Sequence, residues 1–129
     1  MKTIEVVAAV IKNSTGLILA VQRGESSKEY ISKKWEFPGG KIEEGESLQQ
    51  ALQRELTEEL KIEATVAELV TTVDHTYPDF RLIMHAFHCE ITGGQLTLTE
   101  HLDMKWLPKD ELRNLDWAAA DVPIVDLLI

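Results

Sequence analysis

The N-terminal third of the chain alternates between short apolar runs and polar interruptions, a pattern that is typical of β-strands. The runs at residues 4–11 and 17–22 are rich in Val, Ile and Leu, and the turn-forming sequence Asn-Ser-Thr-Gly at residues 13–16 separates them. Residues 23–34 are polar and lack periodicity. We therefore predict two neighbouring strands followed by a surface loop.

The second half of the chain carries further segments with strand composition. Residues 66–77 and 81–91 are rich in β-branched and aromatic residues, and residues 104–107 form another short run. Gly93 and Gly94 predict a hairpin turn that leads into a strand over residues 95–99.

Two segments have helical features. Ser47 and Gln50 form a capping-box pattern before an apolar period that ends at Leu60, which predicts a helix over residues 47–60. Asp121 with Pro123 two residues later indicates the start of a terminal helix. Strands combined with one long central helix and one terminal helix predict an α/β fold, a sandwich around a mixed sheet.

The central helix carries acidic residues on the side that should face the core. At ~100° per residue its leucines define one arc, and Glu55 and Glu59 fall inside that arc with Glu58 at its edge. A solvated acidic face would lie opposite. Because desolvating a carboxylate is costly, the pattern requires a counter-charge. Either Lys and Arg partners supply it in a purely structural network, or a hard divalent cation does.

A glycine-rich segment precedes this helix. Residues 35–37 (Trp-Glu-Phe) predict a short extended piece, and Pro-Gly-Gly at residues 38–40 ends it in a loop where backbone groups can approach a ligand. An isolated Pro-Gly-Gly is an ordinary turn. Its fixed distance from the acidic helix favours a binding site instead.

Composition adds limits on partners. The chain has 129 residues, with 13 Lys and Arg against 22 Asp and Glu, and a formal net charge of −9. This length suits one compact domain, which we place at residues 1–129. Proteins that coat DNA or RNA rely on a basic face, so the acidic balance argues against a nucleic-acid polymer as partner. A small anionic ligand is compatible if a cation mediates its binding.

The sequence also bears on location. The longest apolar run, residues 6–11, is far shorter than the ~20 residues that a membrane span needs. Glu5 interrupts the region that would be apolar in a signal peptide. Cys89 is the only cysteine, so an internal disulfide is excluded. We expect a cytoplasmic protein with no membrane partner, either a monomer or a homodimer.

Around the acidic helix, Gly40 is followed after five residues by Glu46, and after seven more by Arg-Glu-Leu-Thr-Glu-Glu-Leu-Lys-Ile at residues 54–62. This spacing resembles the signature box of the Nudix hydrolases. The one departure is Lys61, where the family usually has Gly. A Lys at this left-handed position costs ~1 kcal/mol but suits the negative helix end, so we expect a slightly altered cap.

The resemblance covers the whole chain. In length and layout the chain is similar to the MutT-like branch of the family, including relatives that act on cytidine triphosphates. It implies an α/β/α sandwich around a mixed sheet, with Mg²⁺ as cofactor and Mn²⁺ as an alternative. The implied metal ligands are Gly39, Glu55, Glu58, Glu59 and Glu100. The implied catalytic residues are Glu55, Arg54 and Glu100, with Glu46 holding Arg54. The implied substrate-binding residues are Arg23, Glu36, Phe37, Pro38, Gly39, Lys41, Arg81 and Asp121.

Some of these residues have ordinary structural alternatives. Glu100 is also consistent with a plain loop acid, Arg81 with a surface charge, and Asp121 with a cap of the terminal helix. The four histidines, which include His101, lack the spacing of a zinc site and are interpreted as structural or surface residues.

The implied function is Mg²⁺-dependent hydrolysis of a (deoxy)nucleoside triphosphate to nucleoside monophosphate and pyrophosphate, as in nucleotide-pool sanitation. Glu55 or Glu100 would act as the base, and the substrate would be of the 8-oxo-dGTP or the CTP/dCTP type. One alternative is hydrolysis of another nucleoside diphosphate linked to a group X, such as a dinucleoside polyphosphate or nucleotide sugar. The other is a non-catalytic nucleotide-binding module.

Overall fold

The strands and helices position one cavity between several distant segments of the chain. A computed structural model describes all 129 residues. In chain order the elements are β1 (Lys2–Ile11), β2 (Ile18–Gln22), β3 (Trp35–Glu36), β4 (Gly39–Lys41), α1 (Leu48–Leu60), β5 (Ile62–Thr76), β6 (Phe80–Gly94), β7 (Asp103–Leu107), the 3-10 helices η1 (Lys109–Asn114) and η2 (Ala119–Asp121), and α2 (Val122–Leu128). No helix among them has the length and apolarity that crossing a membrane requires.

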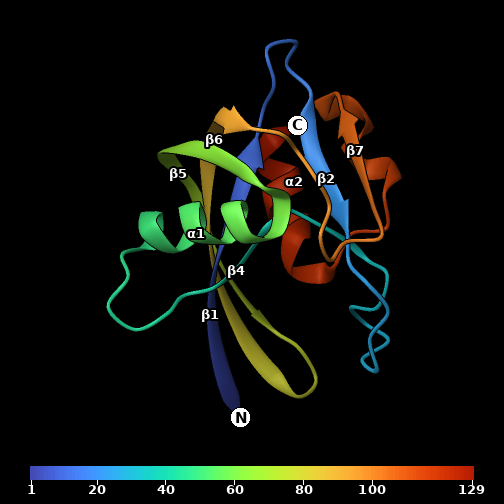
Figure 1. Ribbon diagram of the computed structural model, residues 1–129. Coiled ribbons are helices and arrows are strands. Elements are labelled where there is room, and N and C mark those ends of the chain that lie inside the picture. Colours follow the sequence, from blue (N-terminus) through green and yellow to red (C-terminus); the bar gives the residue numbers. More distant parts are fainter.

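The strands form two sheets. The larger has the order β4-β1-β6-β5, in which β1 and β6 run parallel and the other neighbours antiparallel. The smaller is antiparallel with the order β3-β2-β7. Helix α1 lies across one face of the larger sheet, and α2 lies on the opposite side of that sheet (Figure 1). The predicted α/β/α sandwich around a mixed sheet is confirmed.

Strand β1 explains why the apolar run near the N-terminus is continuous instead of alternating. Val7 and Ala9 pack in the cluster that contains the leucines of α1, whereas Ala8 and Val10 pack in the cluster that contains Ile124 of α2. Both faces of β1 are therefore covered, and every residue on it from position 7 to 11 is buried.

Helix α1 begins and ends as its sequence dictates. The Ser47 hydroxyl accepts from the Gln50 N–H and the Gln50 side chain accepts from the Ser47 N–H, so the predicted capping box is confirmed. At the other end Lys61 adopts φ 59° and ψ 32°, the left-handed conformation that glycine would supply. The cap is therefore not altered, which corrects the expectation for Lys61: the lysine accepts the backbone strain instead.

The predicted turn at Gly93-Gly94 is wrong. Strand β6 continues through both glycines, which pair with Glu63 and Ile62 at the start of β5. A side chain at Gly94 would meet the Lys61 carbonyl at 2.4 Å, so close approach of two backbones explains this glycine. Residues 95–99 form no strand, because they cross over the end of α1 instead of pairing with a sheet.

Candidate active site

A cavity of about 590 Å³ opens between the two sheets and the C-terminal half of α1, which contributes Glu55 and Glu59 to its lining. We call the part formed by its charged and polar groups the acidic end: Arg23, Glu36, Lys41, Glu55, Glu59, Glu100 and His101. We call the part formed by its apolar groups, with Asp121 beside them, the aromatic end: Ile4, Val6, Ile31, Phe37, Tyr77, Phe80, Leu82, Met84 and Asp121. Glu36 lies between the two, because its charge acts on both Glu59 and Asp121. The volume lies within the usual range for a small-molecule site.

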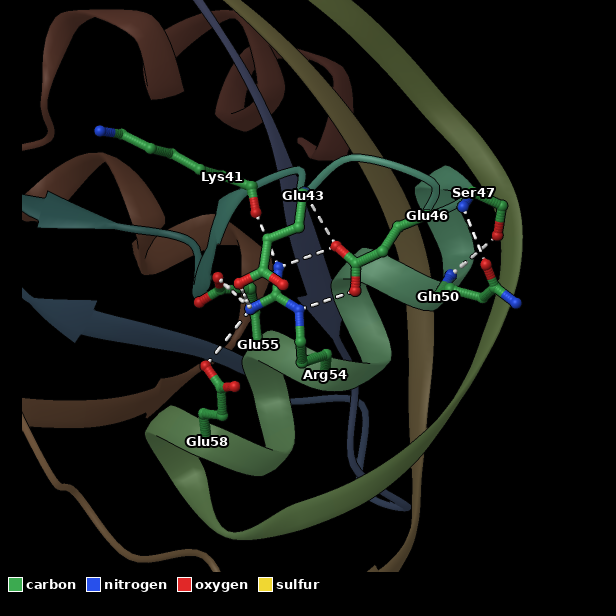
Figure 2. Close-up of polar contacts among 8 residues, drawn as sticks. All are labelled: Lys41, Glu43, Glu46, Ser47, Gln50, Arg54, Glu55 and Glu58. Atoms are coloured by element: carbon green, nitrogen blue, oxygen red, sulfur yellow. Dashed lines mark hydrogen bonds and ion pairs between the residues drawn. The ribbon is translucent and has the colours of Figure 1, made fainter.

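Arg54 organises the acidic side of α1 (Figure 2). Its Nε donates to Glu46 Oε2 at 2.7 Å, its Nη1 to Glu55 Oε1 at 2.9 Å, and its Nη2 to the Lys41 carbonyl at 2.9 Å. The guanidinium holds the pKa of Glu46 below its usual range, and the Glu46 carboxylate raises the pKa of Arg54. Arg54 is therefore a fixed cation that ties the helix to β4.

Strand β4 replaces the predicted glycine-rich loop at residues 39–41. It pairs with β1 so closely that a Cβ at Gly39 would lie 1.9 Å from the Val7 carbonyl oxygen. A Cβ at Gly40 would lie 2.4 Å from the carboxylate of Glu55. Both glycines are required by close approach, and Gly40 leaves the space that the Glu55 carboxylate occupies.

The three glutamates of the acidic motif on α1, Glu55, Glu58 and Glu59, differ in their surroundings. Glu55 is 12% exposed and paired with Arg54, and Glu58 is 59% exposed, with Arg54 Nη1 at 3.3 Å from its Oε2. Glu59 is 18% exposed and has no Lys or Arg partner. Burial and the nearby carboxylates of Glu55, Glu100 and Glu36 raise the pKa of Glu59 to about 8. The structural ion-pair network thus accounts for Glu55 but leaves Glu59 without a counter-charge.

Asp121 lies in the aromatic end of the cavity, near enough to Glu36 and Arg23 for their charges to act on it. Its side chain makes no cap bond to α2; its Oδ1 instead accepts from the Phe37 N–H at 3.0 Å. The residue is 5% exposed, and burial raises its pKa well above the usual range. The alternative that Asp121 caps the terminal helix is therefore wrong, because the side chain turns toward β3 and the cavity.

The remaining predicted residues divide into two groups. Arg23 lines the cavity with its Nη1 at 3.1 Å from Glu36 Oε1, and Lys41 and Glu100 line it as well. Pro38 and Glu58 lie outside the lining. Arg81 also lies outside and forms a two-pronged ion pair with Asp74, whose pKa it lowers. This placement favours the interpretation of Arg81 as a surface charge.

His101 lines the cavity, although the sequence predicts a structural or surface role for the histidines. Its side chain is 7% exposed, with Nε2 at 3.8 Å from Glu36 Oε2 and 3.9 Å from Glu59 Oε2. The feature of the sequence that could have indicated this placement is its position directly after Glu100, a predicted metal ligand. Only the tertiary structure brings it against acids from β3 and α1.

Comparison with known proteins identifies the family. Residues 2–128 match the model described as NUDIX domain. A CTP pyrophosphohydrolase of Escherichia coli is 40% identical over 98% of this chain and 91% of its own length. A putative 8-oxo-dGTP diphosphatase 2 of Mycobacterium tuberculosis is 33% identical over 94% and 84%. The solution structure of the Escherichia coli ORF135 protein is similar with a TM-score of 0.82 and 41% identity, over 98% and 89%. The chain belongs to the Nudix hydrolase family.

The Nudix box now has a three-dimensional form. Its first part, Gly40 and Lys41, is an edge strand on β1; its last part is α1, with Lys61 as the cap. Arg54 joins the two parts through the Lys41 carbonyl and Glu46. The arginine spacing of the box therefore serves the packing of helix on strand as well as the orientation of the acids.

The carboxylate side chains in the cavity are suitable ligands for a divalent cation. Carboxylate oxygens are the ligands that Mg²⁺ prefers, and Glu55 and Glu59 crowd one cavity at an electrostatic cost. No three acidic, histidine or cysteine side chains already form a closed metal cage. A bound cation would relieve the repulsion between Glu59 and the neighbouring carboxylates.

Proposed function

We propose that this Nudix hydrolase cleaves a (deoxy)nucleoside triphosphate to a nucleoside monophosphate and pyrophosphate with Mg²⁺. The observation that carries the proposal is the division of one cavity into an acidic end and an aromatic end. A metal-chelated polyphosphate suits the first, and a flat base suits the second. The names of the CTP pyrophosphohydrolase and 8-oxo-dGTP diphosphatase relatives support the same class of substrate.

The acidic end supplies the groups for phosphoryl chemistry. Mg²⁺, held by Glu55, Glu59, Glu100 and the Gly39 carbonyl, would neutralise the polyphosphate and lower the pKa of a bound water. Glu58 faces solvent in the free chain and would join this set only after leaving Arg54. Lys41 lines the cavity without an ion-pair partner, so its ammonium group is free to meet a phosphate.

Hydrolysis needs a proton acceptor, and Glu55 is the first choice. Its Oε1 accepts from Arg54 Nη1 at 2.9 Å, which fixes the carboxylate, and the carboxylate lies against Gly40 in the cavity wall. In the reaction, water would attack the β-phosphorus, its proton would pass to the carboxylate, and the bridging oxygen would leave with the nucleoside monophosphate. Glu100 is the second choice. Arg23 and Lys41 would stabilise the phosphoryl oxygens as charge develops.

The aromatic end would hold the base. Tyr77 and Phe80 stack at 5.1 Å between ring centroids, and Tyr30 stacks on Tyr77 at 5.1 Å, which makes a stiff wall. Asp121 is the polar group at this end. Burial raises its pKa and so favours the protonated form, which can donate, whereas the ionised form accepts; the group therefore suits the edge of either cytosine or an oxidised guanine.

A panel of nucleotides tests this function. The chain is assayed with Mg²⁺ against CTP, dCTP, a 5-modified dCTP, 8-oxo-dGTP, dGTP, a dinucleoside polyphosphate and a nucleotide sugar, by kcat/KM and by product. We expect pyrophosphate from a triphosphate and loss of turnover with a chelator. Release of orthophosphate, or preference for the two larger substrates, would contradict the proposal. Nucleotide binding without any hydrolysis would identify a non-catalytic module.

A further inference from the structure

The segment between β6 and β7 is fastened to both sides of the acidic end. The Thr99 N–H and hydroxyl both donate to the Glu59 carbonyl, at 3.2 and 2.8 Å, and the Thr97 N–H donates to the Leu60 carbonyl at 2.9 Å. On the other side the Leu102 N–H donates to the Gln22 carbonyl of β2 at 2.9 Å. Residues 97–102 therefore form a short strap that holds His101 at a fixed place.

His101 faces the two carboxylates that approach the cavity from different elements. Its Nε2 lies 3.8 Å from Glu36 Oε2 and 3.9 Å from Glu59 Oε2. Both distances are longer than a hydrogen bond, but a small rotation of a side chain or one bridging water closes either. Polar contacts of this kind are often long in a free enzyme and tighten when substrate binds.

Glu59 has no other nitrogen partner among the ion pairs of the structure. The Arg54 guanidinium is taken by Glu46, Glu55 and Glu58, and the Arg23 guanidinium pairs with Glu36 Oε1. His101 is therefore the only side chain with a nitrogen within ion-pair distance of both Glu59 on α1 and Glu36 on β3. It can donate from Nε2 as a neutral ring, so this contact requires no change of charge.

The opposite nitrogen of the ring makes an unfavourable contribution to stability. Nδ1 is buried and has no hydrogen-bond partner. A buried polar atom without a partner is unfavourable, and an apolar side chain of similar size would avoid the cost. The chain has an imidazole here although its Nδ1 lacks a partner. The other nitrogen, Nε2, is the one directed at the acids of the cavity.

We propose that His101 is a positioning residue that orients the carboxylates of Glu59 and Glu36 for cation binding. This inference rests on the proposed function, because it assigns those acids to the metal and substrate end. Its physical basis is that a donor fixed behind a carboxylate sets which oxygen faces the cation. Loss of such a donor typically lowers metal affinity or activity by ~10–100-fold.

Two substitutions and one control test the proposal. His101→Leu removes the donor at similar size, and His101→Gln places an amide N–H near the position of Nε2. His88→Leu is the matched control, since His88 lies on β6 outside the cavity lining. For each variant, Mn²⁺ affinity is measured without nucleotide by electron paramagnetic resonance. Pyrophosphate release and thermal unfolding in a chelator are measured in parallel.

We expect His101→Leu to bind Mn²⁺ ~10–100-fold more weakly and to lose kcat in the same range, with an unchanged or raised Tm. His101→Gln should recover most of both, and His88→Leu should match the wild type. Wild-type Mn²⁺ affinity in His101→Leu would overturn the proposal, and so would a large drop in its Tm. If the wild type releases no pyrophosphate but the Mn²⁺ affinities differ as expected, the proposed function fails and the positioning role stands.

Discussion

Each end of the cavity holds a carboxyl group that is largely shielded from solvent, partly buried at Glu59 and fully buried at Asp121, but the two groups are balanced in different ways. Glu59 faces other carboxylates and one imidazole, whereas Asp121 accepts a hydrogen bond from the Phe37 backbone. Burial raises the pKa of both. A carboxylate surrounded by like charges favours a cation, and a carboxyl that already has a backbone partner favours a neutral hydrogen-bonding ligand. The difference teaches that burial alone does not specify a ligand; the neighbours do.

The largest expected effect comes from Glu59→Gln. The change keeps the shape but removes the charge that the cation requires, so kcat should fall by at least ~10²-fold. Because the amide cannot ionise among the neighbouring carboxylates, the metal-free chain should be as stable as the wild type, and more stable at a pH where Glu59 would ionise. Steady-state pyrophosphate release and chemical denaturation measure the two effects.

Glu63→Gln is a matched control for this change, because Glu63 lies on β5 outside the cavity lining. It should leave turnover unaltered. Near-normal turnover in Glu59→Gln would show that Glu59 is not a metal ligand. The contrast between the two ends of the cavity would then fail as well.

A smaller and selective effect is expected from Asp121→Ala. The substitution removes one hydrogen-bonding group at the base, so discrimination between the best and worst bases should shrink by ~10–100-fold while hydrolysis persists. It also leaves the buried Phe37 N–H without its acceptor, at a cost of ~1–3 kcal/mol in unfolding free energy. The kcat/KM values over the nucleotide panel and a denaturation curve report these changes.

Asp121→Asn separates the two contributions. An asparagine oxygen still accepts from Phe37, so stability should be kept while the order of preferred bases changes. Equal losses of kcat/KM for every nucleotide would show that Asp121 does not read the base.

The pH dependence of stability gives the smallest expected effect. In metal-free protein the pKa of Glu59 is raised from 4.5 to about 8, so the folded chain keeps a proton that the unfolded chain releases. This contribution to stability is fully present below about pH 4.5 and is lost as the pH rises through about 8. Denaturation in chelator across that window should show a steeper decline for the wild type than for Glu59→Gln.

Addition of Mg²⁺ sharpens the comparison. It should restore stability at the upper end of this window in the wild type, because it replaces the proton as the partner of Glu59. Asp121→Asn should retain this response, since Asp121 is at the other end. An identical pH profile for the wild type and Glu59→Gln would show that Glu59 is not the group responsible.

Local features of the acidic helix were predictable from the sequence because they depend on neighbours a few residues apart. The capping box of Ser47 and Gln50, and the low exposure of the Glu55 and Glu59 side chains, follow from helical spacing. The glycine pair at residues 93–94 was misread, because the same composition serves a hairpin turn and a close approach of two backbones. Only pairing with β5 separates these cases.

The sequence by itself determined the family box, the α/β class and the excess of acid on one helix face. Tertiary structure alone decided which groups meet. It brought Asp121 to the Phe37 N–H across 84 positions, paired Arg81 with Asp74 outside the cavity, and set His101 against Glu36 and Glu59. The physical reason is range: spacing along a helix fixes contacts within a turn or two, whereas contacts between β3, α1 and the strap depend on how the sheets pack.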